Sequence, residues 1–166
     1  MSRATGMVID EISMSVAPFV PSPEEVIRKM LDMAQPTQGE ILYDLGCGDG
    51  RIVVIAARDY LMKAVGIEMR EDLAAKAQEE IKKSNLEGKA EIIQANLFDV
   101  DLSKADVVTL YLTTGGNKKL KPKFEKELRL GSRVVSHDFA IPRWNPMETS
   151  DEPKGPKIYL YKINSR

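Results

Sequence analysis

From residue 41 onward, short apolar runs alternate with longer amphipathic stretches. This alternation is typical of strand–helix–strand units, in which parallel strands are covered on both faces. We expect a further short strand around residues 144–149. The predicted strands span residues 41–45, 64–68, 90–94, 106–112, 133–136 and 157–163, and the predicted helices lie near 50–60, 70–83 and 118–129. The chain is therefore expected to fold as an α/β protein around a mostly parallel sheet.

A helix is also expected before the first strand. The sequence Ser-Pro-Glu-Glu at residues 22–25 is typical of a helix start, because Ser22 can cap the first turn and Pro23 fits the first helical position. Apolar residues then recur on one helical face, namely Val26, Ile27, Met30, Leu31 and Ala34. Residues 1–18 show no helical or strand period, so we interpret them as a flexible lead to a single domain over residues 19–166.

Composition excludes several classes of protein. The 166 residues suffice for one domain, and no apolar run approaches the roughly 18 residues that a membrane span needs. One cysteine and one histidine can form neither an internal disulfide nor a zinc cage. A net charge of −1 gives no strong indication of nucleic-acid binding. Without a secretory signal, a cytoplasmic location is expected, with no structural metal and no membrane contact.

The segment at residues 41–51, ILYDLGCGDGR, predicts a buried strand that runs into a glycine-rich turn and then a helix. Glycine permits positive φ and lets a ligand approach the backbone, and the following helix offers N–H groups. The next apolar run ends at Glu68, where a carboxylate can accept hydrogen bonds from both ribose hydroxyls. Together these features predict a nucleoside-binding site; the alternative is a tight turn that binds nothing.

The spacing and charge of the turn indicate which nucleoside it binds. Its glycines follow the pattern G-x-G-x-G rather than the G-x-G-x-x-G of dinucleotide sites. Asp44 and Asp49 flank the turn, and these two anionic side chains would repel a pyrophosphate. They suit a cofactor that carries an ammonium and a sulfonium group, which points to S-adenosylmethionine.

Two motifs, YDLGCGDG at 43–50 and VGIE at 65–68, resemble the first two motifs of the class I, seven-stranded S-adenosylmethionine-dependent methyltransferases. The resemblance extends from residue 18 to 162 and is sharper to the small archaeal protein-lysine methyltransferases. Mitochondrial lysine methyltransferases share the general pattern. The segments that carry this sharper resemblance are PFVPSPEEV at 18–26, KPKFEKEL at 121–128 and RVVSHDF at 133–139.

The resemblance implies a Rossmann-like class I methyltransferase fold, with a mostly parallel seven-stranded sheet and helices on both faces. It also implies a compact enzyme that methylates lysine side chains on proteins, chromatin proteins among them. We expect the enzyme to work as a monomer. Only a short connection separates the fifth strand from the last, so the usual helix there is expected to be reduced to a loop. This would leave an open face suited to exposed lysines on folded partners.

Position by position, the resemblance implies a cofactor site. Asp44 and the glycines would line the methionine portion, Glu68 would hold the ribose, and Asn96 with Leu97 would flank the adenine. Related enzymes often have Asp at position 96, but an amide carbonyl can still accept from the adenine amino group; alternatively, Asn96 only forms a turn. The predicted cofactor-binding residues are Val20, Pro21, Asp44, Gly46, Cys47, Gly48, Asp49, Gly50, Glu68, Asn96 and Leu97.

Catalytic candidates come from the carboxyl ends of the strands, where open α/β sheets bind ligands. Methyl transfer from a sulfonium mainly requires alignment of the reacting atoms, and the attacking lysine must be neutral. Tyr111 could hydrogen-bond the amine or form a wall of a lysine channel; the alternative is that it only packs in the core. Phe19 could supply another wall. Trp144 is either a third wall or a core anchor. We interpret Cys47 and His137 as structural and the lysines of 118–126 as a solvated helix face.

Two other function classes stay open at this point. One is a methyltransferase that acts on RNA or a small molecule, although RNA binding should require a basic, aromatic surface. The other is a regulatory module that binds a nucleoside without catalysis. The fate of a labelled methyl group distinguishes the alternatives, since label on lysine, on RNA or on nothing points to a different class in each case.

Overall fold

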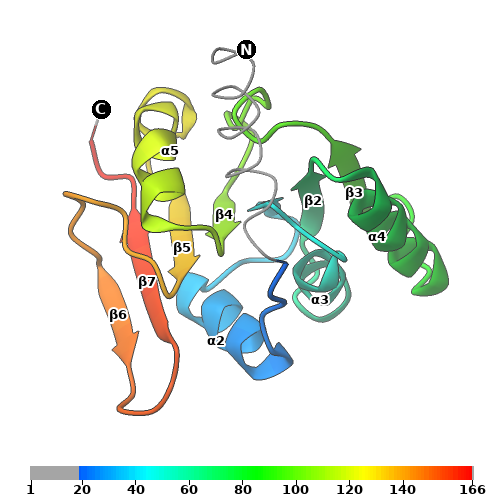
Figure 1. The fold of residues 1–166 in the computed structure, drawn as a ribbon, viewed down its shortest axis with the longest axis horizontal. Coiled ribbons are helices and arrows are strands. Elements are labelled where there is room, and N and C mark those ends of the chain that lie inside the picture. The colour runs from blue at the N-terminus through cyan, green and yellow to red at the C-terminus, as the bar shows by residue number, and fades with distance from the viewer. Residues whose placement is uncertain (1–18, 166) are drawn as a thin grey trace, which may run out of the picture.

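The computed structural model describes residues 19–165, so the expected lead at residues 1–18 lies outside the described part of the chain. Its seven strands form one sheet in the order β3-β2-β1-β4-β5-β7-β6 (Figure 1). The strands are β1 (Ile41–Leu45), β2 (Lys63–Glu68), β3 (Ala90–Gln94), β4 (Val107–Leu110), β5 (Arg133–His137), β6 (Glu148–Asp151) and β7 (Lys157–Lys162). The first five strands are parallel, and β7 is antiparallel to both of its neighbours. The predicted seven-stranded, mostly parallel sheet is confirmed.

Four helices of the described chain cover the sheet: α2 (Glu24–Ala34), α3 (Arg51–Asp59), α4 (Glu71–Lys83) and α5 (Thr114–Glu127). The first three pack on one face, where side chains such as Ile27, Val53 and Ile81 join one apolar core. The fourth packs on the other face through Leu120 and Phe124, which belong to a second core. Figure 1 shows α5 alone on its side of the sheet. Helices on both faces are therefore confirmed.

The connections leave the second face more open than the first. Between β3 and β4, and between β5 and β6, the described residues form turns and loops without a helix. The short connection after the fifth strand is thus a loop, as expected. None of the helices in the described part of the chain is both long and apolar enough to span a membrane.

The start of α2 differs from the prediction. The five apolar residues of its inner face are buried as expected, but Ser22 does not cap the helix. Pro23 occupies the cap position, and its carbonyl accepts hydrogen bonds from the N–H groups of Val26 at 3.0 Å and Ile27 at 3.1 Å. The hydroxyl of Ser22 instead lies 3.0 Å from Nδ1 of His137. Burial of that histidine outweighs the capping preference, because a buried imidazole needs a polar partner.

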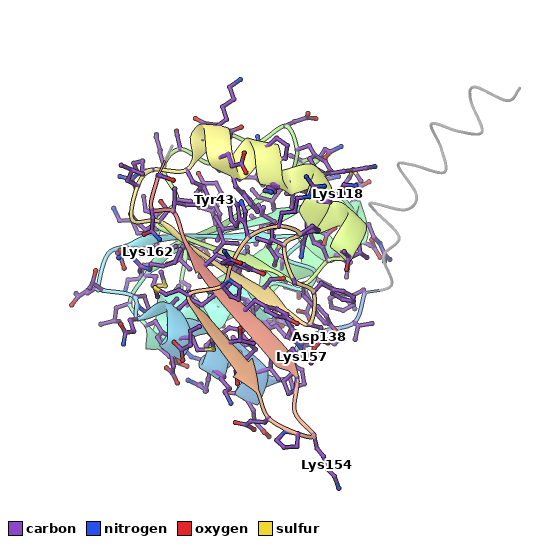
Figure 2. All side chains as sticks on the ribbon, turned by 90° about the vertical axis from the view of Figure 1, so that its left-hand side faces the viewer. Tyr43, Lys118, Asp138, Lys154, Lys157 and Lys162 are labelled. Atoms are coloured by element: carbon purple, nitrogen blue, oxygen red, sulfur yellow. The ribbon has the colours of Figure 1, made fainter. Side chains whose placement is uncertain are left out.

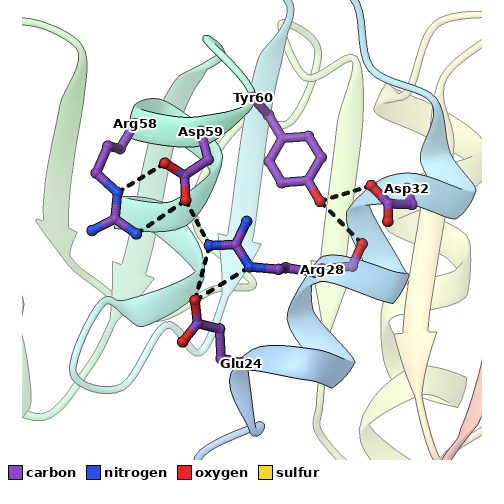
Figure 3. Close-up of polar contacts among 6 residues, drawn as sticks. All are labelled: Glu24, Arg28, Asp32, Arg58, Asp59 and Tyr60. Atoms are coloured by element: carbon purple, nitrogen blue, oxygen red, sulfur yellow. Dashed lines mark hydrogen bonds and ion pairs between the residues drawn. The ribbon is translucent and has the colours of Figure 1, made fainter.

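Polar contacts on the surface join α2 to α3 (Figure 3). The guanidinium of Arg28 lies 2.8 Å from a carboxylate oxygen of Glu24 in its own helix and 2.8 Å from one of Asp59 in α3. The hydroxyl of Tyr60 donates to Asp32 at 2.7 Å. Exposed pairs of this kind each contribute only about 0–1 kcal/mol. They link the two helices at the surface and add little to the stability of the fold.

Two other predicted boundaries were wrong. Helix α5 begins at Thr114 rather than near residue 118, because the side chain of Thr113 accepts from the N–H of Gly116 at 2.9 Å and so caps the helix. Strand β6 covers Glu148–Asp151 rather than residues 144–149. Trp144 precedes it and packs against the rings of Phe124 and Tyr161, with centroid distances of 6.1 and 5.7 Å.

Candidate active site

A cleft of about 260 Å³ lies at the carboxyl ends of β1, β2 and β4. Strands β1 and β4 are neighbours although they are not consecutive, so the chain reverses its direction of winding there. Ligands of open α/β sheets bind at this kind of switch point. The cleft is lined by the turn after β1, the end of β2, the segments after β3 and β4, and residues 19–22 before α2.

The turn after β1 depends on glycine at three positions. Gly46, Gly48 and Gly50 have φ values of 79°, 55° and 83°, a region that disfavours other residues. A Cβ at Gly50 would lie 2.8 Å from Cβ of Ala77, and one at Gly48 would lie 2.1 Å from Cε2 of Phe19. Gly46 lines the cleft, whereas Gly48 and Gly50, also predicted to bind the cofactor, are not among its lining residues. Both glycines shape the turn.

The N–H groups of the turn are directed inward. Those of Gly46 and Cys47 donate to the carbonyl of Ile67 at 2.8 and 2.9 Å, and that of Gly50 donates to Cys47 at 2.9 Å. The expectation that the turn and the helix start present free donors to a ligand is thus not met at these positions. The turn offers close approach and carboxylates rather than an anion-binding nest, which suits a ligand with positive charge.

Glu68, the last residue of β2, is 8% exposed and lines the cleft. Its Oε1 accepts from the N–H of Gly48 at 2.9 Å, and its Oε2 accepts from the N–H of Arg70 at 3.0 Å. These bonds fix the carboxylate, and each oxygen retains a lone pair that can accept from a hydroxyl group. The two hydroxyl groups of a ribose could each donate a hydrogen bond to one of these oxygens.

The two aspartates of the turn have different electrostatic surroundings. Asp44 is buried and accepts from the hydroxyl of Thr109 at 2.8 Å, and no ion pair within residues 19–165 involves it. Burial raises the pKa of Asp44 to about 7, and the charges of Glu68 and Asp49 add to the increase. Asp49 pairs with Arg51 at 2.7 Å; although burial acts in the opposite direction, this contact lowers the pKa of Asp49. Asp44 is therefore the carboxylate available to a cation of the ligand.

The chain thus fits S-adenosylmethionine on two counts. Asp44 and Glu68 supply an acid for a cationic end and an acceptor for a hydroxylated ring, and Gly46 of the turn lines the cleft with them. The thiol of Cys47 also lines the cleft, but burial raises its pKa, so it stays protonated at neutral pH. A nucleophilic role for this cysteine is therefore disfavoured.

Asn96 and Leu97, predicted to flank the adenine, line the cleft beside the end of β2. The Oδ1 of Asn96 accepts from the N–H of Phe98 at 3.0 Å, as in the turn-forming alternative. Asn96 can form this turn and still accept a hydrogen bond from a ligand in the cleft, because its carbonyl oxygen has two lone pairs. Val20 and Pro21 line the cleft from the segment before α2.

The aromatic residues divide into two groups. Tyr111, Phe19 and Phe139 line the cleft, and the ring centroids of Tyr111 and Phe139 lie 6.3 Å apart. Burial raises the pKa of Tyr111, and Asp138 adds to the increase. Trp144 lies outside the cleft and takes the alternative role of core anchor.

Sequence reasoning missed the surroundings of His137. This residue is 3% exposed, contacts Ser22, and packs on Tyr111 with ring centroids 3.9 Å apart. Burial lowers its pKa, and the charge of Asp138 opposes that effect. Phe139, two residues further along, was likewise absent from the predicted site. The rule that ligands bind at strand ends could have found both, because His137 is the last residue of β5 and Phe139 follows two residues later.

The sheet order, the glycine turn after β1 and the buried acid at the end of β2 together define a class I S-adenosylmethionine-dependent methyltransferase. The sequence model of the ANTKMT methyltransferase domain matches residues 44–148, and the chain belongs to that family. The expected enzyme class and cofactor are thereby confirmed.

Three comparisons describe its relatives. The chain is 49% identical to a protein-lysine N-methyltransferase of Saccharolobus islandicus over 150 residues, which cover 88% of this chain and 93% of that protein. It is 29% identical to the adenine nucleotide translocase lysine N-methyltransferase of Mus musculus over 89% of its length, and it spans 63% of that longer protein. The crystal structure of an RNA methyltransferase from Salinibacter ruber with S-adenosyl-L-homocysteine superposes with a TM-score of 0.86 at 43% identity, covering 89% of this chain and 95% of that one.

Proposed function

We propose that this methyltransferase acts on the side-chain amines of lysines in proteins. The observation that carries the proposal is the similarity to the Saccharolobus protein-lysine N-methyltransferase, which extends over nearly the whole of both chains. The mouse relative, named for lysine methylation of another protein, supports the same acceptor class.

The geometry of the cleft is compatible with an amine acceptor. S-adenosylmethionine supplies a methyl group on a positively charged sulfur, and its transfer forms a carbon–nitrogen bond while the carbon–sulfur electron pair stays on sulfur. Tyr111 and Phe19 stand at the part of the cleft formed after β4 and before α2. Aromatic faces there can hold the aliphatic stem and the nitrogen of a lysine in line with the donor.

An uncharged amine is required for attack, and its free pKa is near 10.4. Partly buried aromatic walls and a nearby positive charge both lower that pKa, because each disfavours the ammonium form. The lysine ammonium loses one proton to water before the attack, and the methylated nitrogen then carries the positive charge that leaves the sulfur, so we assign no strong general base. Tyr111 and Phe19 are proposed as the catalytic residues through positioning, and the predicted cofactor set remains the proposed binding site.

RNA is the second candidate acceptor, and a specific observation favours it: the structure from Salinibacter ruber is named as an RNA methyltransferase. Against it stand the net charge of −1 and the pairing of Lys121 and Lys123 with glutamates of the same helix. RNA binding gains most from a surplus of Lys and Arg that neutralise phosphates, and the near-neutral chain has no such surplus.

The test is incubation with methyl-labelled cofactor and either a protein mixture or total RNA. Label on lysine, located by peptide mass spectrometry, supports the proposal, and label on RNA alone contradicts it. Cofactor binding with label on neither acceptor would point to the non-catalytic alternative.

Finer assignments belong to the same proposal. The loop in place of a helix after β5 leaves an open face, which favours a broad range of folded protein substrates, chromatin proteins included. We further propose an archaeal source, a cytoplasmic location and a monomeric state. Sedimentation of the purified chain checks the last of these.

A further inference from the structure

The segment at residues 19–22, here called the strap, forms one wall of the cleft. Phe19 at its beginning packs on the glycine turn so closely that a Cβ at Gly48 would overlap its ring. Ser22 at its end is 4% exposed, and its carbonyl accepts from Nη1 of Arg51 at 3.4 Å. The strap is thus held against the turn at one end and against the first residue of α3 at the other, and a third contact comes from a different part of the fold.

That third contact is made by His137, the last residue of β5. Its Nδ1 lies 3.0 Å from Oγ of Ser22, across a sequence separation of 115 residues. Both side chains are almost fully buried, and buried polar groups of this kind are costly when unpaired. Ser22 makes this contact in place of the expected cap of α2, so the contact is not a by-product of helix formation.

The same imidazole also packs against Tyr111, which forms another part of the cleft wall. Its ring centroid lies 3.9 Å from that of Tyr111, with 33° between the planes. Ring centroids of packed aromatic pairs are usually about 4.5–7 Å apart, so the two rings are in close contact. Asp138 lies beside the far nitrogen, with Oδ2 3.6 Å from Nε2. Figure 2 shows Asp138 next to Lys157 at the start of β7, and their backbones pair there at 2.7 Å.

We propose that His137 is a positioning residue, which holds the strap through Ser22 and the Tyr111 ring through direct packing, so that the two walls stand at the spacing an acceptor side chain requires. This inference rests on the proposed lysine acceptor and deepens it. The buried ring of His137 thereby aligns Phe19 of the strap and Tyr111, the two residues proposed to face the acceptor.

Three variants separate the two contacts. Ser22→Ala removes the hydroxyl, His137→Phe keeps a flat ring for Tyr111 but removes Nδ1, and His137→Asn keeps a polar atom near Nδ1 but removes the ring. Ser132→Ala is the matched control, because it removes another buried serine hydroxyl, bonded to the carbonyl of Ala105 at 3.2 Å at the far end of β5.

We expect Ser22→Ala and His137→Phe each to raise KM for a protein acceptor about fivefold and to speed amide hydrogen exchange in the strap, with little change in kcat. The double variant should be no worse than either single one, because both remove the same contact. His137→Asn should restore slow exchange in the strap while KM stays raised. The control should change neither quantity.

Additive effects of Ser22→Ala and His137→Phe, or unchanged exchange and KM in both, would overturn the positioning role even though the wild-type enzyme methylates lysine. If the wild-type enzyme methylates no protein, the proposed function fails instead. Amide hydrogen exchange in the strap and the affinity for the cofactor then still report whether the contact between Ser22 and His137 holds the strap. Thermal melting of each variant shows whether a loss reflects the cleft or unfolding of the whole chain.

Discussion

Two buried carboxylates give the cleft its chemical character at the scale of single residues. Glu68 is fixed by two backbone N–H groups, whereas Asp44 has a single hydroxyl donor and a pKa raised to about 7. Glu68 is held as an acceptor for neutral donors. Asp44 carries a negative charge that no ion pair within residues 19–165 neutralises. A ligand that places hydroxyl groups at Glu68 and a positive charge at Asp44 gains binding free energy from both contacts.

The cofactor should bind more tightly as the pH rises from 5.5 to 7. Asp44 is largely protonated at the lower value, and a cationic ligand favours its ionised form, so we expect affinity to rise about tenfold over this range. The raised pKa also means that the contribution of Asp44 to the free energy of unfolding falls as the pH rises from about 4 to 7, because the folded state holds this proton more tightly. Calorimetric titration at several pH values measures the first effect. Asp44→Asn should bind weakly with no such slope, and a wild-type affinity independent of pH contradicts the assignment.

Replacement of Glu68 tests the proposed ribose contact. Glu68→Ala should weaken cofactor binding by at least about tenfold, the loss expected for hydrogen bonds to a charged acceptor. Glu68→Gln keeps the shape and one carbonyl acceptor, so its loss should be smaller. Equal affinity of wild type and Glu68→Ala in a fluorescence or calorimetric titration would remove the ribose assignment.

At the scale of elements, local patterns explain which predictions succeeded. Strands β1 and β2 and the turn after β1 depend on residues close together in sequence. Two apolar runs predicted the strands, and the three glycines predicted the turn. Helix α5 began earlier than expected, because the hydroxyl of Thr113 caps a segment whose glycines resemble a loop. The contact of Ser22 with His137 could not be predicted, because it depends on the order of the strands.

The junction between the turn and α3 offers a prediction about stability. Gly50→Ala combines an unfavourable positive φ with a Cβ 2.8 Å from Ala77, whereas Gly88→Ala has φ of 87° but open space around the new atom. We expect losses in the free energy of unfolding of about 2–4 kcal/mol for the first and about 1 kcal/mol for the second. Urea denaturation measures both, and equal losses would mean that the packing against α4 is unimportant.

At the scale of the whole molecule, one partly buried ion pair joins distant segments. Arg133 of β5 contacts both carboxylate oxygens of Glu40 at 2.6 and 3.0 Å and donates to the carbonyl of Ala34 at the end of α2. This contact lowers the pKa of Glu40. Glu40→Gln should therefore reduce stability at pH 7 by about 1–3 kcal/mol. The difference from wild type should shrink as the pH falls below 4.5, and a difference that persists in acid would show that charge is not the cause.

The account as a whole depends on the cleft at the switch point between β1 and β4 holding the methyl donor. A crystal structure with S-adenosyl-L-homocysteine tests this most directly. We expect ribose hydroxyls on Glu68, the amino group of the ligand near Asp44, and its sulfur facing Tyr111. Electron density for the ligand at another surface, or an empty cleft at saturating ligand, would contradict the account.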